Sequence, residues 1–185
     1  MAVFSLSFDR SHSLWRWIAI ALSGAAFITL GAKVQIPFWP VPMTLHTLAV
    51  FFVAAMLGPR PGMVAMIAYL GAGAMGLPVF SGSPERGTGL AYMAGPTGGY
   101  LLGFLVASGL VGWLAEGRSW IGRALAMLTG LAVVYAAGLT WLAAFLPRTE
   151  LLAAGLTPFL LGDLVKVALA ATLVSGVFRV KLRLT

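Results

Sequence analysis

Long apolar segments, broken by proline and glycine, constrain this chain more than any other feature. The hydrocarbon core of a bilayer takes a helix of roughly 20 apolar residues, within a range of about 17–25. Six segments approach or reach that length: residues 14–33, 41–57, 61–76, 98–115, 121–146 and 158–178. Soluble domains are about one-quarter charged, whereas only 9% of the 185 residues of this chain are charged and 60% are hydrophobic. The sequence therefore predicts an all-α membrane protein, a single domain over residues 1–185 built as a six-transmembrane-helix bundle.

The segments are separated by residues that helices tolerate poorly. Pro37, Pro40 and Pro42 fall within six residues, and proline cannot donate a backbone hydrogen bond. Residues 58–62 (Gly-Pro-Arg-Pro-Gly) predict a tight turn, and residues 77–97 hold several glycines and prolines in what we expect to be the longest connection. The second and third segments are short, which suits helices that are partly buried or that border a cavity.

Basic residues are distributed unevenly between the two ends of these segments. With the N-terminus inside, eight fall on the inner side: Arg10, Arg16, Arg60, Arg118, Arg123, Arg179, Lys181 and Arg183. Three fall on the outer side: Lys33, Arg86 and Arg148. Because Lys and Arg concentrate in cytoplasmic loops, both termini are predicted to be cytoplasmic. The apolar run that begins at Leu14 is too long for a typical signal peptide, so we expect it to be a retained span.

Several functional classes are not supported by the sequence. The chain has no cysteine, and its two histidines, His12 and His46, lie far apart, so we expect neither a disulfide nor a metal site. No phosphate-binding loop of the G-x-x-x-x-G-K-[ST] type occurs, so ATP hydrolysis would need a partner. The net charge of +7 comes from basic residues that stand mainly in loops and at the C-terminus, which favours membrane topology over nucleic acid. No cofactor is expected.

Asp163 and Lys166 stand out because they are charged and lie inside the last apolar segment. Each such residue costs about 2.5–3.5 kcal/mol near a helix centre. A spacing of three places them on one helix face, where they can interact. A purely structural ion pair is one interpretation, but function is the better default for intramembrane charges. A carboxylate accepts and an ammonium donates hydrogen bonds, so the pair suits a small polar ligand.

Other residues are expected at the same outer level, and we take them as candidate ligand contacts. They are Trp39, Thr44, His46, Arg86, Tyr92 and Gly98. Glycines near Gly98 would bring backbone N–H groups close to an anion at a helix N-terminus. Other interpretations stay open: Trp39 as an interfacial anchor, His46 as a bundle residue with its bonds satisfied, and Arg86 as a solvated loop charge.

Small residues recur at intervals of four in two segments. Gly99, Gly103 and Ala107 predict close helix packing inside the bundle. Ala21 and Ala25 either pack within the bundle or dock another membrane subunit. No internal or inverted repeat is visible, which disfavours a secondary transporter of the usual kind.

Several stretches, in one order, resemble the BioY family, the biotin-specific substrate-binding subunits (S-components) of energy-coupling-factor (ECF) transporters. They are Gln35-Ile36-Pro37, residues 40–47 (Pro-Val-Pro-Met-Thr-Leu-His-Thr), Leu57-Gly58-Pro59, residues 76–80 (Gly-Leu-Pro-Val-Phe), residues 95–101 (Gly-Pro-Thr-Gly-Gly-Tyr-Leu) and residues 162–166 (Gly-Asp-Leu-Val-Lys). The match runs from about residue 34 to 105 and again near 158–170. One position departs from the pattern, because the family commonly has glutamine where this chain has His46.

The resemblance implies a prokaryotic plasma membrane protein that binds biotin from the outer face of a six-helix bundle. It implies partnership with a transmembrane coupling subunit and two cytoplasmic ATPases, with solitary action and self-association left open. The family's small-x-x-x-small signature, which docks the coupling subunit, is matched by Ala21 and Ala25. An S-component for another vitamin and an intramembrane enzyme that uses His46 and Asp163 as acid and base are the alternatives.

Overall fold

The computed structural model describes residues 13–36, 43–82, 84 and 87–184 of the chain. Its elements are α1 (Ser13–Lys33), β1 (Gln35–Ile36), β2 (Met43–Thr44), α2 (His46–Leu57), α3 (Pro59–Ala74), α4 (Gly89–Ala94), α5 (Gly98–Leu114), α6 (Trp120–Leu142), α7 (Leu151–Gly155) and α8 (Thr157–Leu184). The fold is essentially helical, since the two strands are a two-residue antiparallel pair that joins Gln35 to Thr44 and Ile36 to Met43.

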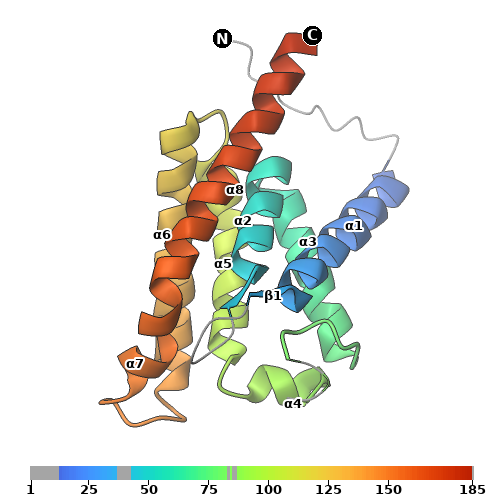
Figure 1. Cartoon of the computed structure of the whole chain (residues 1–185). Helices are drawn as coiled ribbons and strands as arrows, with labels where there is room; N and C mark the ends of the chain where they lie inside the picture. Colours follow the sequence, from blue (N-terminus) through green and yellow to red (C-terminus); the bar gives the residue numbers. More distant parts are fainter. Residues whose placement is uncertain (1–12, 37–42, 83, 85–86, 185) are drawn as a thin grey trace.

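In the part of the chain that the structure describes, six long helices form a bundle, and two short helices lie at one end of it. Figure 1 shows α1, α2, α3, α5, α6 and α8 running along the molecule, with α4 and α7 at the lower end. The start of α1 and the last turns of α8 lie at the upper end. We call the end with α4 and α7 the loop end and the opposite end the terminal end.

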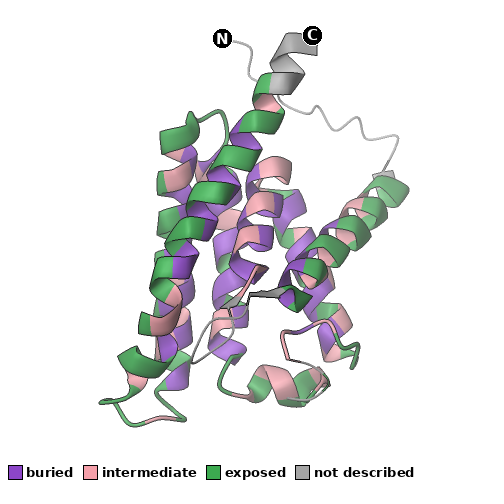
Figure 2. Ribbon diagram, viewed as in Figure 1, coloured by how far each residue is buried: buried purple, intermediate pink, exposed green. Residues whose placement is uncertain are grey.

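The exterior of the bundle is apolar, as expected for a protein surrounded by lipid. Many large hydrophobic side chains are exposed, among them Trp15, Leu22, Trp113 and Leu161. Figure 2 shows exposed residues along the outer faces of α1 and α8, with buried residues turned inward. Three segments, Leu14–Lys33, Trp120–Leu142 and Leu151–Arg179, are long and apolar enough to cross a membrane, and α2 and α5 are shorter apolar helices. The chain is therefore a multi-pass membrane protein.

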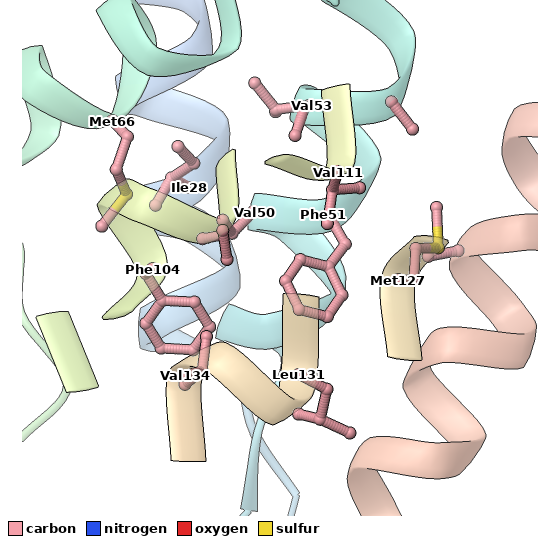
Figure 3. Packing of buried hydrophobic residues seen from close by; sticks show 14 of the residues in the cluster. Ile28, Val50, Phe51, Val53, Met66, Phe104, Val111, Met127, Leu131 and Val134 are labelled. Carbon is pink, nitrogen blue, oxygen red and sulfur yellow. The ribbon is translucent and has the colours of Figure 1, made fainter. Parts of the chain in front are cut away.

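The core lies between α2, α3, α5 and α6, with α1 and α8 packed on either side. Figure 3 shows side chains from several helices meeting in this core, including Phe51, Met66, Phe104 and Met127. The most extensive helix contact is that between α5 and α6. It depends on glycine, because a Cβ at Gly103 would lie 2.8 Å from the Val134 Cα. The stripe of Gly99, Gly103 and Ala107 is therefore buried within the bundle.

Each predicted segment contains a helix, but several boundaries differ. The tight turn predicted over residues 58–62 is reduced to Gly58, because α3 already begins at Pro59, where proline fits the first turn of a helix. The helix predicted to end at residue 178 continues to Leu184. The helix predicted from residue 41 begins at His46, because Met43 and Thr44 pair as strand β2. The helix predicted to end at residue 146 ends at Leu142, with turns after it. Two stretches expected to be connections contain the short helices α4 and α7. The glycine- and proline-rich composition of residues 77–97 hid α4, a short helix that packs against α3 and α5.

Candidate functional site

Asp163 and Lys166 form a salt bridge inside the bundle. Both lie on α8, and their side chains turn inward, with only 6% and 4% of the two residues exposed. The Lys166 Nζ donates to the Asp163 Oδ1 over 2.8 Å. At 1.5 Å per residue, Asp163 lies about 9 Å from the first residue of α8. The predicted pair therefore exists, and it lies inside the bundle, inward from the loop end, rather than at the surface.

Tyr135 on α6 completes this pair, and sequence reasoning missed it. Its hydroxyl donates to the second carboxylate oxygen, Asp163 Oδ2, over 2.6 Å. The Asp163 carboxylate thus has one protein donor on each oxygen, and each oxygen keeps a further lone pair for another donor. The available signal was a phenol hydroxyl in an apolar span, which needs a polar partner once it is buried.

His46 lies in an aromatic setting at the start of α2. Its ring centroid is 4.7 Å from that of Phe104 on α5 and 5.3 Å from that of Tyr69 on α3. It is also within electrostatic reach of Lys166. His46 is buried, and its Nε2 has no hydrogen-bond partner among the described residues. A buried polar atom without a partner is costly, so Nε2 is a natural contact for a polar ligand.

A series of aromatic rings connects His46 to the loop end. Tyr69 packs edge-on against Phe80, with centroids 5.5 Å apart. Phe80 stacks on Tyr92 of α4, with centroids 4.8 Å apart and an interplanar angle of 18°. The Tyr92 hydroxyl donates to the Ser81 carbonyl over 2.7 Å, which ties α4 to the preceding loop. The predicted residue Tyr92 is therefore joined to His46 through two rings that were not predicted to contribute.

The remaining candidates fall into three groups. Thr44 is half-buried in β2, two residues before His46. Gly98 is buried at the start of α5, and a Cβ there would overlap the Met93 carbonyl, so its position reflects close packing against α4. Trp39 and Arg86 lie outside the described residues.

Ala21 and Ala25 lie partly inside the bundle. Both are half-buried, and Ala25 packs against the hydrophobic core. The neighbouring Gly24 approaches Ala65 of α3 so closely that a Cβ would overlap it. The structure thus gives this stripe an internal contact, and docking to another subunit stays a prediction.

A groove of about 610 Å³ lies elsewhere, between α5 and α6. Its lining is almost entirely apolar, formed by Gly99, Leu102, Ala136, Ala137, Thr140, Trp141, Ala144 and Phe145. None of the charged or imidazole side chains contributes to it. We therefore place the candidate site at the polar and aromatic cluster and not in this groove. Among the described residues no group of three or more His, Asp or Glu side chains could hold a metal ion.

The cluster is built from five helices at a similar depth. Tyr69, Phe104, Tyr135 and Asp163 each lie between one and three turns from the loop end of their own helices, and His46 is the first residue of α2. Donors, acceptors and flat aromatic rings thus converge in one layer inside an apolar bundle. This combination is that of a membrane protein with a candidate binding site for a small polar molecule.

Comparison with known proteins identifies the family. The BioY family model matches residues 7–183, and the chain belongs to the BioY family. It is 39% identical over 148 residues to the biotin transporter BioY of Thermotoga maritima, covering 79% of this chain and 86% of that protein. It is 37% identical over 145 residues to the probable biotin transporter BioY of Pyrococcus horikoshii, covering 78% and 85%.

A solved structure agrees with this family. The S-component for biotin from an ECF-type ABC transporter superimposes with a TM-score of 0.77, 27% identity and 95% coverage of both chains. The resemblance drawn from the ordered sequence motifs is confirmed. The named relatives are transporters, and on that ground the chain is a transporter protein and not an enzyme.

Proposed function

We propose that this protein captures biotin for uptake as the substrate-binding subunit of an ECF-type importer. The observation that supports it most is the buried Asp163–Lys166 pair beside His46, whose Nε2 has no partner among the described residues. Intramembrane charges that face a bundle interior commonly mark substrate sites. The named relatives are biotin transporters, and the structural neighbour is a biotin S-component.

Biotin has chemistry that matches this cluster. Its bicyclic head carries a ureido group with two N–H donors and one carbonyl, and its tail ends in a carboxylate. Asp163 would accept from the ureido N–H groups while Lys166 holds the carbonyl. Tyr92 would pack against the ring system, and His46 and Thr44 would supply further polar contacts.

The carboxylate tail would lie nearer the loop end. Arg86 or the amides around Gly98 would receive it, and Trp39 would join Tyr92 in packing against the ring system. The reverse pose places the carboxylate on Lys166, and a structure with bound biotin distinguishes the two poses.

The proposed topology has six spans, formed by α1, α2, α3, α5, α6 and α8, in a single domain over residues 1–185. Both termini are cytoplasmic, in a prokaryotic plasma membrane. The support is the position of the basic residues. Arg16, Arg60, Arg118 and Arg179 lie at the terminal end, whereas Lys33 ends α1 and Arg148 follows α6, two helices that run to the loop end. The site then lies nearer the outer face of the membrane than the cytoplasmic face.

The proposed partners supply the energy for transport. A transmembrane coupling subunit and two ATPases would drive reorientation of the whole bundle, because the chain has no visible repeats to rock against each other. Ala21 and Ala25 on α1 are the proposed docking positions, and self-association is an alternative mode. No cofactor is part of this proposal.

The test is biotin binding by purified variants. We expect Asp163→Asn and Lys166→Met each to weaken biotin binding by roughly 10–150-fold, since a hydrogen bond to a charged group contributes about 1.5–3 kcal/mol. Isothermal titration calorimetry on protein freed of ligand measures the effect. Thr140→Val, in the apolar groove of α6, is the matched control and should bind normally.

Two outcomes would contradict the proposal. Normal affinity in both charge variants would remove the assignment of the site. Tighter binding of a different vitamin in the same titration would favour an S-component for that vitamin. Mass spectrometry of the ligand that survives purification gives an independent answer.

A further inference from the structure

Arg123 is a buried cation at the terminal end, far along α6 from the proposed biotin site. It lies in the first turn of α6 and is only 9% exposed. Its Nη1 donates to the Ser175 Oγ on α8 over 2.9 Å. Its guanidinium carbon lies 4.7 Å from the centroid of the Phe178 ring. Its Nε has no hydrogen-bond partner among the described residues.

No carboxylate in the described part of the chain neutralises this charge. Asp163, the buried carboxylate of α8, pairs with Lys166 on a different level of the bundle. A neutral hydroxyl and an aromatic face stabilise a guanidinium but do not cancel its charge. Buried charges are normally paired, so the residues around Arg123 lack an anion.

The surroundings favour an anion at this point. Arg123 sits at the N-terminus of a 23-residue helix, where the helix dipole is positive and backbone N–H groups are free. The Ser119 side chain accepts from Gly122 N and so caps one of these groups. Arg118 precedes the helix and Arg179 lies one turn beyond Ser175, and both are exposed.

The surface on both sides of Arg123 is that of a lipid-facing rim. Ile121 and Leu125 on α6 are 64% and 59% exposed, and Leu173 and Val177 on α8 are also exposed. Trp120 is exposed as well, and its indole N–H donates to the Thr172 hydroxyl on α8 over 3.0 Å. Tryptophan favours the membrane–water interface. An anion that reaches Arg123 therefore arrives beside apolar surface suited to acyl chains.

We infer that Arg123, with the N-terminus of α6 and the adjacent face of α8, binds the phosphate of an acidic membrane phospholipid. The guanidinium edge that carries Nε would donate to the phosphate oxygens, and the acyl chains would lie along the exposed apolar residues of α6 and α8. Basic pockets between transmembrane helices are known sites for such head groups. Arginine suits this role because its planar fork matches phosphate geometry.

Native mass spectrometry of the full-length protein tests this inference. The unaltered protein is expected to retain phosphatidylglycerol more strongly than phosphatidylcholine. Arg123→Gln should lower phosphatidylglycerol retention by about fivefold, the factor expected for one basic residue near an anionic head group. Arg148→Gln, at the opposite end, is the matched control and should retain the lipid. Biotin binding of Arg123→Gln checks that the variant is folded.

Several results would overturn the inference. Equal retention of the two lipids by the unaltered protein would do so without any variant. An equal loss in Arg148→Gln would show general charge attraction. If inorganic phosphate displaced phosphatidylglycerol completely, the site would be one for free phosphate and not for a lipid. Unchanged lipid retention in Arg123→Gln, together with loss of a co-purifying coupling subunit, would assign the guanidinium to a carboxylate of that protein.

Discussion

At the residue scale, the proposed site depends on three side chains that hold one carboxylate and one cation in place. Tyr135 and Lys166 donate to different oxygens of Asp163, which orients the carboxylate from both sides. An oriented carboxylate needs no rearrangement when a ligand donor arrives, so less binding energy is spent on ordering it. Tyr135 is therefore a positioning residue in this proposal, and Asp163 and Lys166 are the contacts.

His46 provides a prediction at the same scale. If the free Nε2 bonds the ligand, His46→Leu should weaken biotin binding by on the order of tenfold, because about one hydrogen bond is lost. His46→Gln should bind nearly as well as the unaltered protein, since its amide both donates and accepts. Titration calorimetry measures both affinities.

A buried serine outside the site is the control for His46. Ser108 on α5 is buried, and its hydroxyl donates to the Phe104 carbonyl of its own helix. Ser108→Ala should leave biotin affinity unchanged. If His46→Leu also binds normally, the imidazole is a packing residue and makes no ligand contact.

At the element scale, helices approach one another through glycine. In lipid, apolar burial gives no net drive for association, so close van der Waals contact takes its place. Gly103 meets Val134 of α6, and Gly24 and Gly31 of α1 meet Ala65 and Ala49. These contacts set the distance between helices and so the position of the side chains that form the site.

Adding one methyl group at Gly103 tests this packing. A Cβ there would lie 2.8 Å from the Val134 Cα, a backbone atom that cannot turn aside. We expect Gly103→Ala to lower the free energy of unfolding by about 1–3 kcal/mol. Thermal unfolding in detergent measures the change.

Gly176 in α8 is the matched control, because no atom lies within 4 Å of an added Cβ. Gly176→Ala should leave stability unchanged or raise it by up to about 1 kcal/mol, since alanine favours the helix. Equal unfolding temperatures for the Gly103 and Gly176 variants would contradict tight packing of α5 on α6.

At the scale of the whole molecule, the proposed orientation places α4 and α7 outside the cell. The absence of cysteine makes a direct test possible, because each introduced thiol is the sole one. Glu116 at the terminal end and Thr149 at the loop end are both exposed. A membrane-impermeant maleimide on intact cells should label Thr149→Cys, and should label Glu116→Cys only after permeabilisation.

The opposite labelling pattern would contradict the proposed topology and show that both termini lie outside the cell. It would also place the Asp163 site on the cytoplasmic side, which conflicts with capture from outside. Labelling of both thiols in intact cells would indicate that the chain inserts in two orientations.

Much of the helical framework was predictable, because lipid permits few backbone solutions. Apolar length and Pro/Gly breaks located six helices, and α5 begins at the predicted residue, Gly98. The inward-facing pair Asp163–Lys166 followed from the cost of exposing charge to hydrocarbon. The family was predictable from ordered motifs, and the family match confirms it. The short helix α4 was missed because its local composition indicates a loop.

By itself, the sequence determined that the chain enters a membrane, where a helix satisfies all its backbone hydrogen bonds within its own segment. It also determined that Asp163 and Lys166 lie close together on one face of a helix. Only the tertiary structure decided which residues join them. Tyr135 is 28 positions from Asp163, and His46 is farther still. Such neighbours depend on how helices cross and on how closely glycines such as Gly103 let them approach. Apolar periodicity cannot encode that geometry, because it indicates which segments are helical but not which face meets which.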